Sequence, residues 1–233
     1  YSFDHQDNTY KSWWGVDDLP EVNKANGEFQ DFIYKGEDSV IKTWLREGVK
    51  GWRLDVVDEL PDYFVRELKT SLKAVDPEGV LIGEVWEDAS NKVSYGKQRE
   101  YFSGYELDSA MNYPFRETLI KYFLYEEKAF NTARRLMSLY ENYPRENFMA
   151  AMNLIGSHDR ERILTVLGGA KAGPDWSEIQ KAEFKLDEAA RKLAVKRLKL
   201  LSVIQLTFPG VPAIYYGDEA GLEGFLDPYN RKT

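Results

Sequence analysis

The sequence predicts an α/β fold of the (β/α)8-barrel type that is incomplete, and three observations support this prediction. Short apolar segments that suit strands alternate with amphipathic segments that suit helices, which indicates right-handed βαβ units and a parallel sheet. Neither GxGxxG nor GxxxxGK[ST] is present, so the phosphate loop that is typical of a doubly wound sheet is missing. Acidic residues instead follow the predicted strands, where barrels keep their active sites.

The first half of the chain is predicted to contain two strand–helix units. Residues 39–46 form a short amphipathic helix that Gly48 ends, and residues 49–57 form a strand. Residues 62–75 form the next helix, and a turn at 76–79 leads into a strand over 80–85. The apolar residues that share one face of the longer helix are Phe64, Val65, Leu68, Leu72 and Val75.

The second half of the chain continues this alternation. We expect strands over 105–111, 148–155 and 211–215. We expect helices near 115–125, 130–141 and 187–205, of which the last has the clearest apolar periodicity. These strands bring the expected total to about five, whereas a closed barrel has eight strands in roughly 250 residues.

Composition excludes several classes of function. The formal charge is −8 and the pI is about 5.0, so nucleic acid and anionic membranes are repelled. No apolar run approaches the roughly 20 residues that cross a membrane, and residues 1–7 do not resemble a secretory signal, which leaves the compartment open. The chain has no cysteine, and its two histidines, His5 and His158, are too few for a His-rich zinc site.

The segment Gly51–Val56 contains the first candidate for chemistry. Side chains alternate along a strand, so Arg53 and Asp55 share the face that points into a barrel near its mouth. A buried structural ion pair explains the same pattern equally well.

Two further acids follow predicted strands. Glu84 ends an apolar strand, where partial desolvation favours the protonated carboxyl and would let it donate a proton near neutral pH. A glutamate that merely caps a loop is the common alternative. Asp159 follows His158 just beyond another strand, and a surface His–Asp pair would look the same.

Taken together, these segments resemble, in the right order, three motifs of the α-amylase family, glycoside hydrolase family 13. Residues 53–55 resemble the fourth-strand motif, residues 83–86 the fifth-strand motif and residues 158–159 the seventh-strand motif. Residues 10–23 are similar to the loop before the fourth strand in neopullulanase-like members. Residues 209–219 resemble the eighth-strand signature. The resemblance therefore runs over almost the whole chain.

The resemblance implies a role for each of these residues. Asp55 would be the nucleophile and Glu84 the general acid/base of a retaining hydrolase that acts on α-linked glucans through a covalent glycosyl-enzyme. Asp159 would hold the distorted sugar, Arg53 would orient Asp55, and His158 would bind the sugar at the cleavage site. A 4-α-glucanotransferase with the same residues and a non-catalytic amylase-like binding protein are the alternatives; retention of all three acids argues against the second.

Substrate specificity is implied by four further residues. Glu59, in Val56–Glu59 after the nucleophile, and Trp86 after the acid resemble those of neopullulanase, cyclomaltodextrinase and amylopullulanase members more than those of simple α-amylases. The expected linkage is α-1,4, and action on α-1,6 linkages stays open. Asp227 and Arg231 match a loop that grips a sugar on the non-reducing side in those enzymes. A structural salt bridge in a long loop explains these last two residues equally well.

One family motif has no counterpart here, namely the third-strand Asp and Asn-His pair that contacts substrate and often calcium. We therefore expect no cofactor or metal in this chain, while calcium in a full-length enzyme stays open. We expect residues 1–233 to be a partial catalytic barrel with strands four to eight, without the first three units or the C-terminal β-domain. Its open sheet edges predict self-association, and the chain alone is expected to have little or no hydrolase activity.

Overall fold

Parallel strands lie at the centre of the computed structural model, which describes residues 1–4, 9–173 and 175–231, so His5 lies outside the described residues. Strands β3 (Gly51–Leu54), β4 (Val80–Gly83) and β7 (Ser109–Ala110) form one parallel sheet in that order. Strands β8 (Met152–Leu154) and β9 (Val211–Ala213) form a parallel pair. A parallel bridge between Met111 and Met152 connects the two groups, so the five strands follow one another in chain order.

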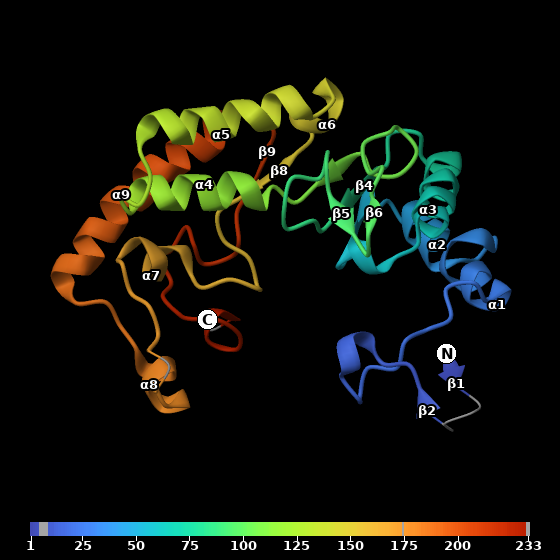
Figure 1. Ribbon diagram of the computed structural model, residues 1–233, viewed down its shortest axis with the longest axis horizontal. Coiled ribbons are helices and arrows are strands. Elements are labelled where there is room, and N and C mark those ends of the chain that lie inside the picture. Colours follow the sequence, from blue (N-terminus) through green and yellow to red (C-terminus); the bar gives the residue numbers. More distant parts are fainter. Residues whose placement is uncertain (5–8, 174, 232–233) are drawn as a thin grey trace.

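Helices separate most of these strands along the chain, whereas the β5–β6 hairpin lies between β4 and β7 (Figure 1). The first strands are flanked by α2 (Val40–Arg46) and α3 (Asp62–Val75). Between β7 and β8 lie α4 (Tyr113–Phe123), α5 (Ala129–Asn142) and α6 (Arg145–Met149). Between β8 and β9 lie α7 (Ile163–Leu167), α8 (Glu178–Glu183) and α9 (Glu188–Thr207).

The remaining elements are short. The first residues pair as β1 (Phe3–Asp4) and β2 (Thr9–Tyr10), followed by a 3-10 turn at Trp13–Gly15. Helix α1 (Gly27–Gln30) continues into a π-helical turn at Asp31–Lys35. Strands β5 (Val93–Ser94) and β6 (Lys97–Gln98) form a hairpin, and 3-10 turns occur at Val57–Glu59 and Tyr229–Arg231.

The long helices begin and end within two residues of the predicted positions. Pro61 precedes α3, whose buried face consists of four of the five predicted apolar residues. Asp187 caps α9 by accepting a hydrogen bond from the Ala190 N–H at 2.8 Å, and the helix ends at Thr207, just before Pro209. Local signals are sufficient here because caps and breakers act within a few residues.

All five predicted strands are longer than the observed ones, and of the strand predicted over 105–111 only Ser109–Ala110 is present. The strand predicted over 49–57 is only Gly51–Leu54, because Val56 takes a left-handed φ of 37° and turns the chain. The strand predicted over 148–155 is only Met152–Leu154, since Phe148 belongs to α6. A short apolar run cannot distinguish a buried helix from a buried strand. Helices α7 and α8 and the β5–β6 hairpin were not predicted.

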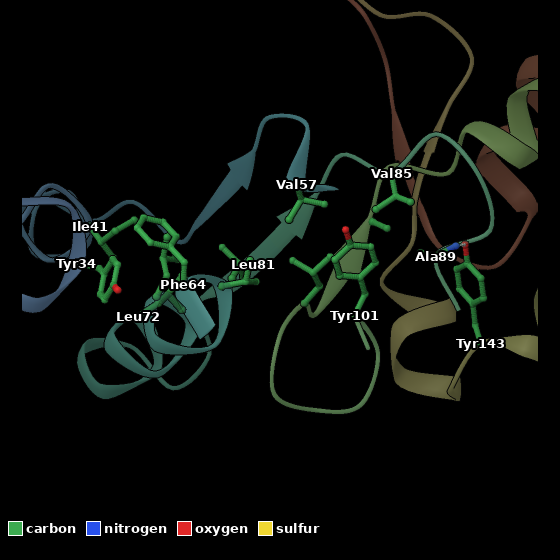
Figure 2. Packing of buried hydrophobic residues seen from close by; sticks show 14 of the residues in the cluster. Tyr34, Ile41, Val57, Phe64, Leu72, Leu81, Val85, Ala89, Tyr101 and Tyr143 are labelled. Atoms are coloured by element: carbon green, nitrogen blue, oxygen red, sulfur yellow. Dashed lines mark hydrogen bonds between the residues drawn. The ribbon is translucent and has the colours of Figure 1, made fainter. Parts of the chain in front are cut away.

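The hydrophobic core consists of two large clusters and a small third one, formed by Met111, Tyr113 and Leu154. The first lies between α2, α3 and strands β3 and β4, where Tyr34, Phe64 and Leu81 are almost completely buried (Figure 2). The second cluster lies among α4, α7 and α9 and includes Phe115. Phe208, at the end of α9, packs against both clusters, so the two halves of the sheet share a continuous apolar support. Burial of each large side chain contributes roughly 1.5–3 kcal/mol.

Both edges of this sheet are open within the described ranges. Strand β3 pairs only with β4, and β9 pairs only with β8. Several large apolar side chains near β9 are exposed. Self-association through these edges stays a prediction, which measurement of the mass by size-exclusion chromatography tests. The exposed apolar residues of α9 and the β9 region are Leu193, Leu200, Val203, Leu206, Val211 and Ile214. None of the described helices is long and apolar enough to cross a membrane.

Candidate active site

Asp55 and Glu84 lie side by side at the carboxyl end of the sheet. Asp55 directly follows β3 and Glu84 directly follows β4. Because Leu54 is in register with Gly83, the two acids are the next pair along neighbouring parallel strands. The predicted placement of these two residues is confirmed.

Arg53 connects the two carboxyl groups. Its Nη1 donates a hydrogen bond to Asp55 Oδ1, and its Nη2 lies 3.1 Å from Glu84 Oε2, although not aligned for a hydrogen bond. The carboxylates of Asp55 and Glu84 therefore each lie beside a different terminal nitrogen of the Arg53 guanidinium. Their exposure differs greatly, since the Asp55 side chain is 72% exposed and that of Glu84 is 2% exposed.

The setting of Glu84 is buried but not apolar, so that part of the sequence prediction is wrong. Its Oε2 accepts a hydrogen bond from the Val56 N–H at 2.8 Å, and its Oε1 accepts one from Trp86 Nε1 at 3.1 Å. Val56 itself takes a left-handed φ, a costly conformation for a β-branched residue, so the chain turns at the residue whose N–H meets Glu84. Two hydrogen-bond donors and the guanidinium of Arg53 thus fix the carboxyl group in place.

His158 and Asp159 lie in the loop after β8. His158 Nε2 is 3.2 Å from Asp159 Oδ2, and both side chains are a little under half exposed. The Asp159 N–H donates to Ser157 Oγ, which is itself 3.5 Å from the hydroxyl of Tyr113. The loop is therefore coupled to the start of α4.

Tyr113 is a residue of this site that the sequence did not reveal. It is fully buried, and burial raises the pKa of its hydroxyl, with the charges of Glu84 and Asp159 raising it further. Its hydroxyl thus lies within the electrostatic reach of both acids. The only local signal is Asn112-Tyr113-Pro114, in which Asn112 caps α4.

The loop that carries Asp227 and Arg231 packs against the His158 loop. Buried Asn230 donates hydrogen bonds to the carbonyl oxygens of His158 and Arg160. Arg231 Nε lies 2.8 Å from Asp227 Oδ1, and both side chains are about half exposed. The salt bridge named as the structural alternative is thus present, while the sugar-gripping role stays a prediction.

A buried ion pair that was not predicted connects the loops after β8 and β9. Arg162 Nη1 lies 3.2 Å from Asp218 Oδ1, and both side chains are almost completely buried. Burial raises the pKa of Asp218 to about 6, against the opposing effect of Arg162. A Cβ at Gly156 would lie 2.0 Å from Asp218 Oδ2, so this approach requires a glycine.

Glu59 lies beside the two acids among aromatic rings. Its Oε1 accepts a hydrogen bond from Trp14 Nε1 at 2.9 Å and another from the Tyr95 hydroxyl. The Trp14 ring stacks on Trp13 with centroids 4.2 Å apart and meets Trp86 edge to face at 6.2 Å. The contribution of Tyr95 was missed, because Tyr95-Gly96 is the two-residue turn of the β5–β6 hairpin and only its glycine is typical of such a turn.

Two hollows open beside the acids. One of about 570 Å³ is lined by Asp55, Glu59 and Trp13 among others, and one of about 290 Å³ is lined by Glu84, Trp86 and Glu59 among others. Small-molecule sites typically occupy about 300–1,000 Å³. Within the described residues, no group of three or more His, Cys, Asp or Glu side chains is arranged to hold a metal ion.

Comparison with known proteins identifies the family of this chain. Residues 1–232 match the family described as "Alpha amylase, catalytic domain". This chain belongs to the α-amylase family. The expected fold class, an α/β barrel that is partial in this chain, agrees with this membership.

The most similar relatives include bacterial glycosidases. The chain is 38% identical to an amylopullulanase of Thermoanaerobacter thermohydrosulfuricus over 97% of this chain and 16% of that protein. It is 35% identical to a cyclomaltodextrinase of Geobacillus thermopakistaniensis over 96% of this chain and 32% of that protein. The α-amylase-type chain thus spans about a third or less of these two relatives.

Solved structures show the same fold. A debranching enzyme of Nostoc punctiforme, soaked with acarbose, matches with a TM-score of 0.73 and 29% identity over 96% of this chain and 45% of that chain. Cyclic α-maltosyl-(1→6)-maltose hydrolase of Arthrobacter globiformis in complex with maltose matches with a TM-score of 0.74 and 28% identity, over 95% of this chain and 43% of that chain.

Proposed function

We propose that this chain supplies the catalytic carboxylates of a retaining glycoside hydrolase that cleaves α-1,4 and α-1,6 linkages of α-glucans. The observation that carries the proposal is the pairing of Asp55 and Glu84 on one guanidinium, at the ends of neighbouring parallel strands. The names of the relatives, amylopullulanase and cyclomaltodextrinase, support an α-glucan as substrate. We number β3, β4, β7, β8 and β9 as barrel strands four to eight.

In the first step, exposed Asp55 attacks the anomeric carbon while Glu84 donates a proton to the leaving oxygen. The bond from that carbon to the leaving oxygen breaks, and a glycosyl ester with Asp55 forms. In the second step, Glu84 takes a proton from water, the water oxygen bonds to the anomeric carbon, and Asp55 leaves as a carboxylate. The anomeric configuration is inverted twice and is therefore retained.

Arg53 suits this exchange because it contacts both acids at once. Before the first step the negative charge resides on Asp55, and afterwards it resides on Glu84, because Asp55 has become an ester. A guanidinium between the two stabilises the charge in either position without moving, and a preorganised donor of this kind costs no reorganisation during the reaction.

Asp159 and His158 are proposed to hold the hydroxyls of the sugar at the cleavage site, and Asp227 and Arg231 those of a sugar on the non-reducing side. Their roughly half-exposed side chains leave polar atoms accessible to a ligand. Carboxylates near a cationic, oxocarbenium-like transition state also favour it electrostatically.

The configuration of the first product tests this proposal. In the catalytically active form of the protein, proton NMR of maltodextrin cleavage should show the α-anomer first, and Asp55→Asn should abolish its formation. Initial release of the β-anomer would contradict the proposed double displacement. Products longer than the substrate would instead identify a glucanotransferase that uses the same residues.

A further inference from the structure

Three segments that are distant in sequence meet at the Glu59 carboxyl group. Trp14 comes from the turn after β2, Glu59 from the 3-10 turn after β3, and Tyr95 from the tip of the β5–β6 hairpin. Both rings donate to the same oxygen, Glu59 Oε1. One carboxylate therefore fixes the orientation of two aromatic side chains.

These rings face solvent although their orientation is fixed. The exposed fraction is 54% for Trp14 and 76% for Tyr95. An exposed large aromatic residue loses hydrophobic stabilisation unless something covers it. Trp13 covers one face of the Trp14 ring, and a hydrogen bond through the polar edge of each ring leaves the other face of Trp14 and the ring of Tyr95 available to a ligand. This geometry suits a ligand that stacks on aromatic faces.

The hairpin that carries Tyr95 is firmly attached to the segment after β3. Arg99, which is buried, donates hydrogen bonds to the carbonyl oxygens of Asp58 and Leu60 and lies 3.1 Å from Asp62 Oδ1. Lys92 pairs with Asp58 at 3.0 Å. Positive φ angles at Tyr95 and Gly96 give the tight turn that matches the twist of the two strands. Tyr95 thus stands on a rigid support.

The two rings lie between two hollows. One of about 450 Å³ is lined by Lys11, Glu21 and Trp14 among others. The other, of about 290 Å³, contains Glu84. Trp14, Glu59 and Tyr95 line both hollows. Since Glu84 is the proposed proton donor to the leaving oxygen, this side of the groove is where the leaving group emerges.

We propose that Trp14 and Tyr95 form an aromatic platform that binds a glucosyl unit on the leaving-group side of the groove, and that Glu59 is the positioning residue that aligns the two rings. The C–H faces of a pyranose ring pack on aromatic faces, while its hydroxyls reach polar groups such as Lys11 and Glu21. The identity of the ligand as a glucosyl unit rests on the proposed function. Tyr95 is then a residue that determines specificity for long chains.

Calorimetric titration of the 233-residue chain with maltoheptaose tests the platform. All variants carry Asp55→Asn, so the ligand is not consumed and binding is measured without turnover. Tyr95→Ala should weaken binding about ten-fold, the effect of losing one ring contact. Tyr95→Phe, which keeps the ring and loses only the hydrogen bond to Glu59, should weaken it about two- to three-fold.

Two controls separate the platform from a merely structural role. Tyr105→Ala removes a tyrosine of similar exposure, 72%, outside the groove and should leave binding unchanged. Glu59→Ala should weaken binding as Tyr95→Ala does. Glu59→Gln, whose amide oxygen can accept from both rings, should restore the affinity to within about three-fold.

Steady-state kinetics of the same variants in the catalytically active form, with Asp55 intact, test the platform independently, because loss of binding changes KM more than kcat. Tyr95→Ala should raise KM for maltoheptaose about ten-fold with a much smaller change in kcat, whereas the control Tyr105→Ala should leave both constants unchanged. Equal affinity of Tyr95→Ala and its parent, or no binding by the parent chain, would overturn the platform. Neither result would bear on Asp55 as nucleophile, because that role is tested by the products.

Discussion

The two ends of the sheet hold their polar residues in different ways. Near β3 and β4, Asp55 and Glu84 follow directly on the strands, and strand register and Arg53 determine their relative position. Near β8, the His158–Asp159 pair lies several residues beyond the strand in a loop. The buried Arg162–Asp218 ion pair and the hydrogen bond from Asn230 stabilise that loop.

This difference matches the precision that each step requires. Bond making and breaking needs groups held within about 0.5 Å of the productive geometry, and strands provide more precise supports than loops. Holding sugar hydroxyls tolerates more movement, so a loop fixed by long-range polar contacts is sufficient. Substitutions near β3 and β4 should therefore lower the rate of catalysis. Substitutions near β8 should lower stability and substrate binding.

The largest effect is expected for Glu84 and Asp55. Asp55→Asn removes the nucleophile and should lower kcat by about four or more orders of magnitude. Glu84→Gln should lower kcat on maltodextrin by about 10²–10⁴-fold but much less on aryl glycosides, whose leaving groups need little protonation. Rate assays on both substrate types provide the comparison. Equal losses on the two substrates would argue that Glu84 is not the acid.

A smaller effect, on stability, is expected for the buried ion pair. Asp218→Ala leaves Arg162 buried without its partner and should lower the free energy of unfolding by about 3–5 kcal/mol. Asp227→Ala breaks an exposed pair and should cost about 1 kcal/mol or less. Urea denaturation of the two variants measures both values. Similar losses would show that burial does not distinguish the two pairs.

A still smaller effect should depend on pH. Burial raises the pKa of Asp218 from 3.8 to about 6, so the folded chain binds this proton more tightly than the unfolded chain. The stability due to this group is therefore present below pH 4 and is lost as the pH rises to about 6. The stability of the wild type minus that of Asp218→Asn should fall by about 1–3 kcal/mol over this interval. A difference that rises with pH would show that attraction to Arg162 outweighs burial.

Local sequence patterns predicted the parts of the site that depend on local structure. Arg53 and Asp55 share a strand face because side chains alternate, and Glu84 follows an apolar strand. The donors around Glu84 could not be predicted, because the left-handed conformation of Val56 has no signal in a β-branched residue.

The long-range parts of the structure escaped prediction for a different reason. Arg162 and Asp218 belong to loops more than fifty residues apart, and neither side chain differs locally from an ordinary surface charge. The same applies to Glu59 and Tyr95, which meet only because the hairpin folds back on the segment after β3. Pairings of this kind follow from the tertiary fold and not from periodicity.

Chemical trapping of the nucleophile is the most direct test of the central claim. A fluorinated α-glucosyl fluoride that forms the glycosyl-enzyme quickly and hydrolyses slowly should accumulate as a covalent adduct in the catalytically active form. Peptide mass spectrometry should place that adduct on Asp55, and Asp55→Asn should carry none. An adduct on Glu84 or Asp159, or turnover without any trapped ester, would contradict the assignment of the two acids that Arg53 connects.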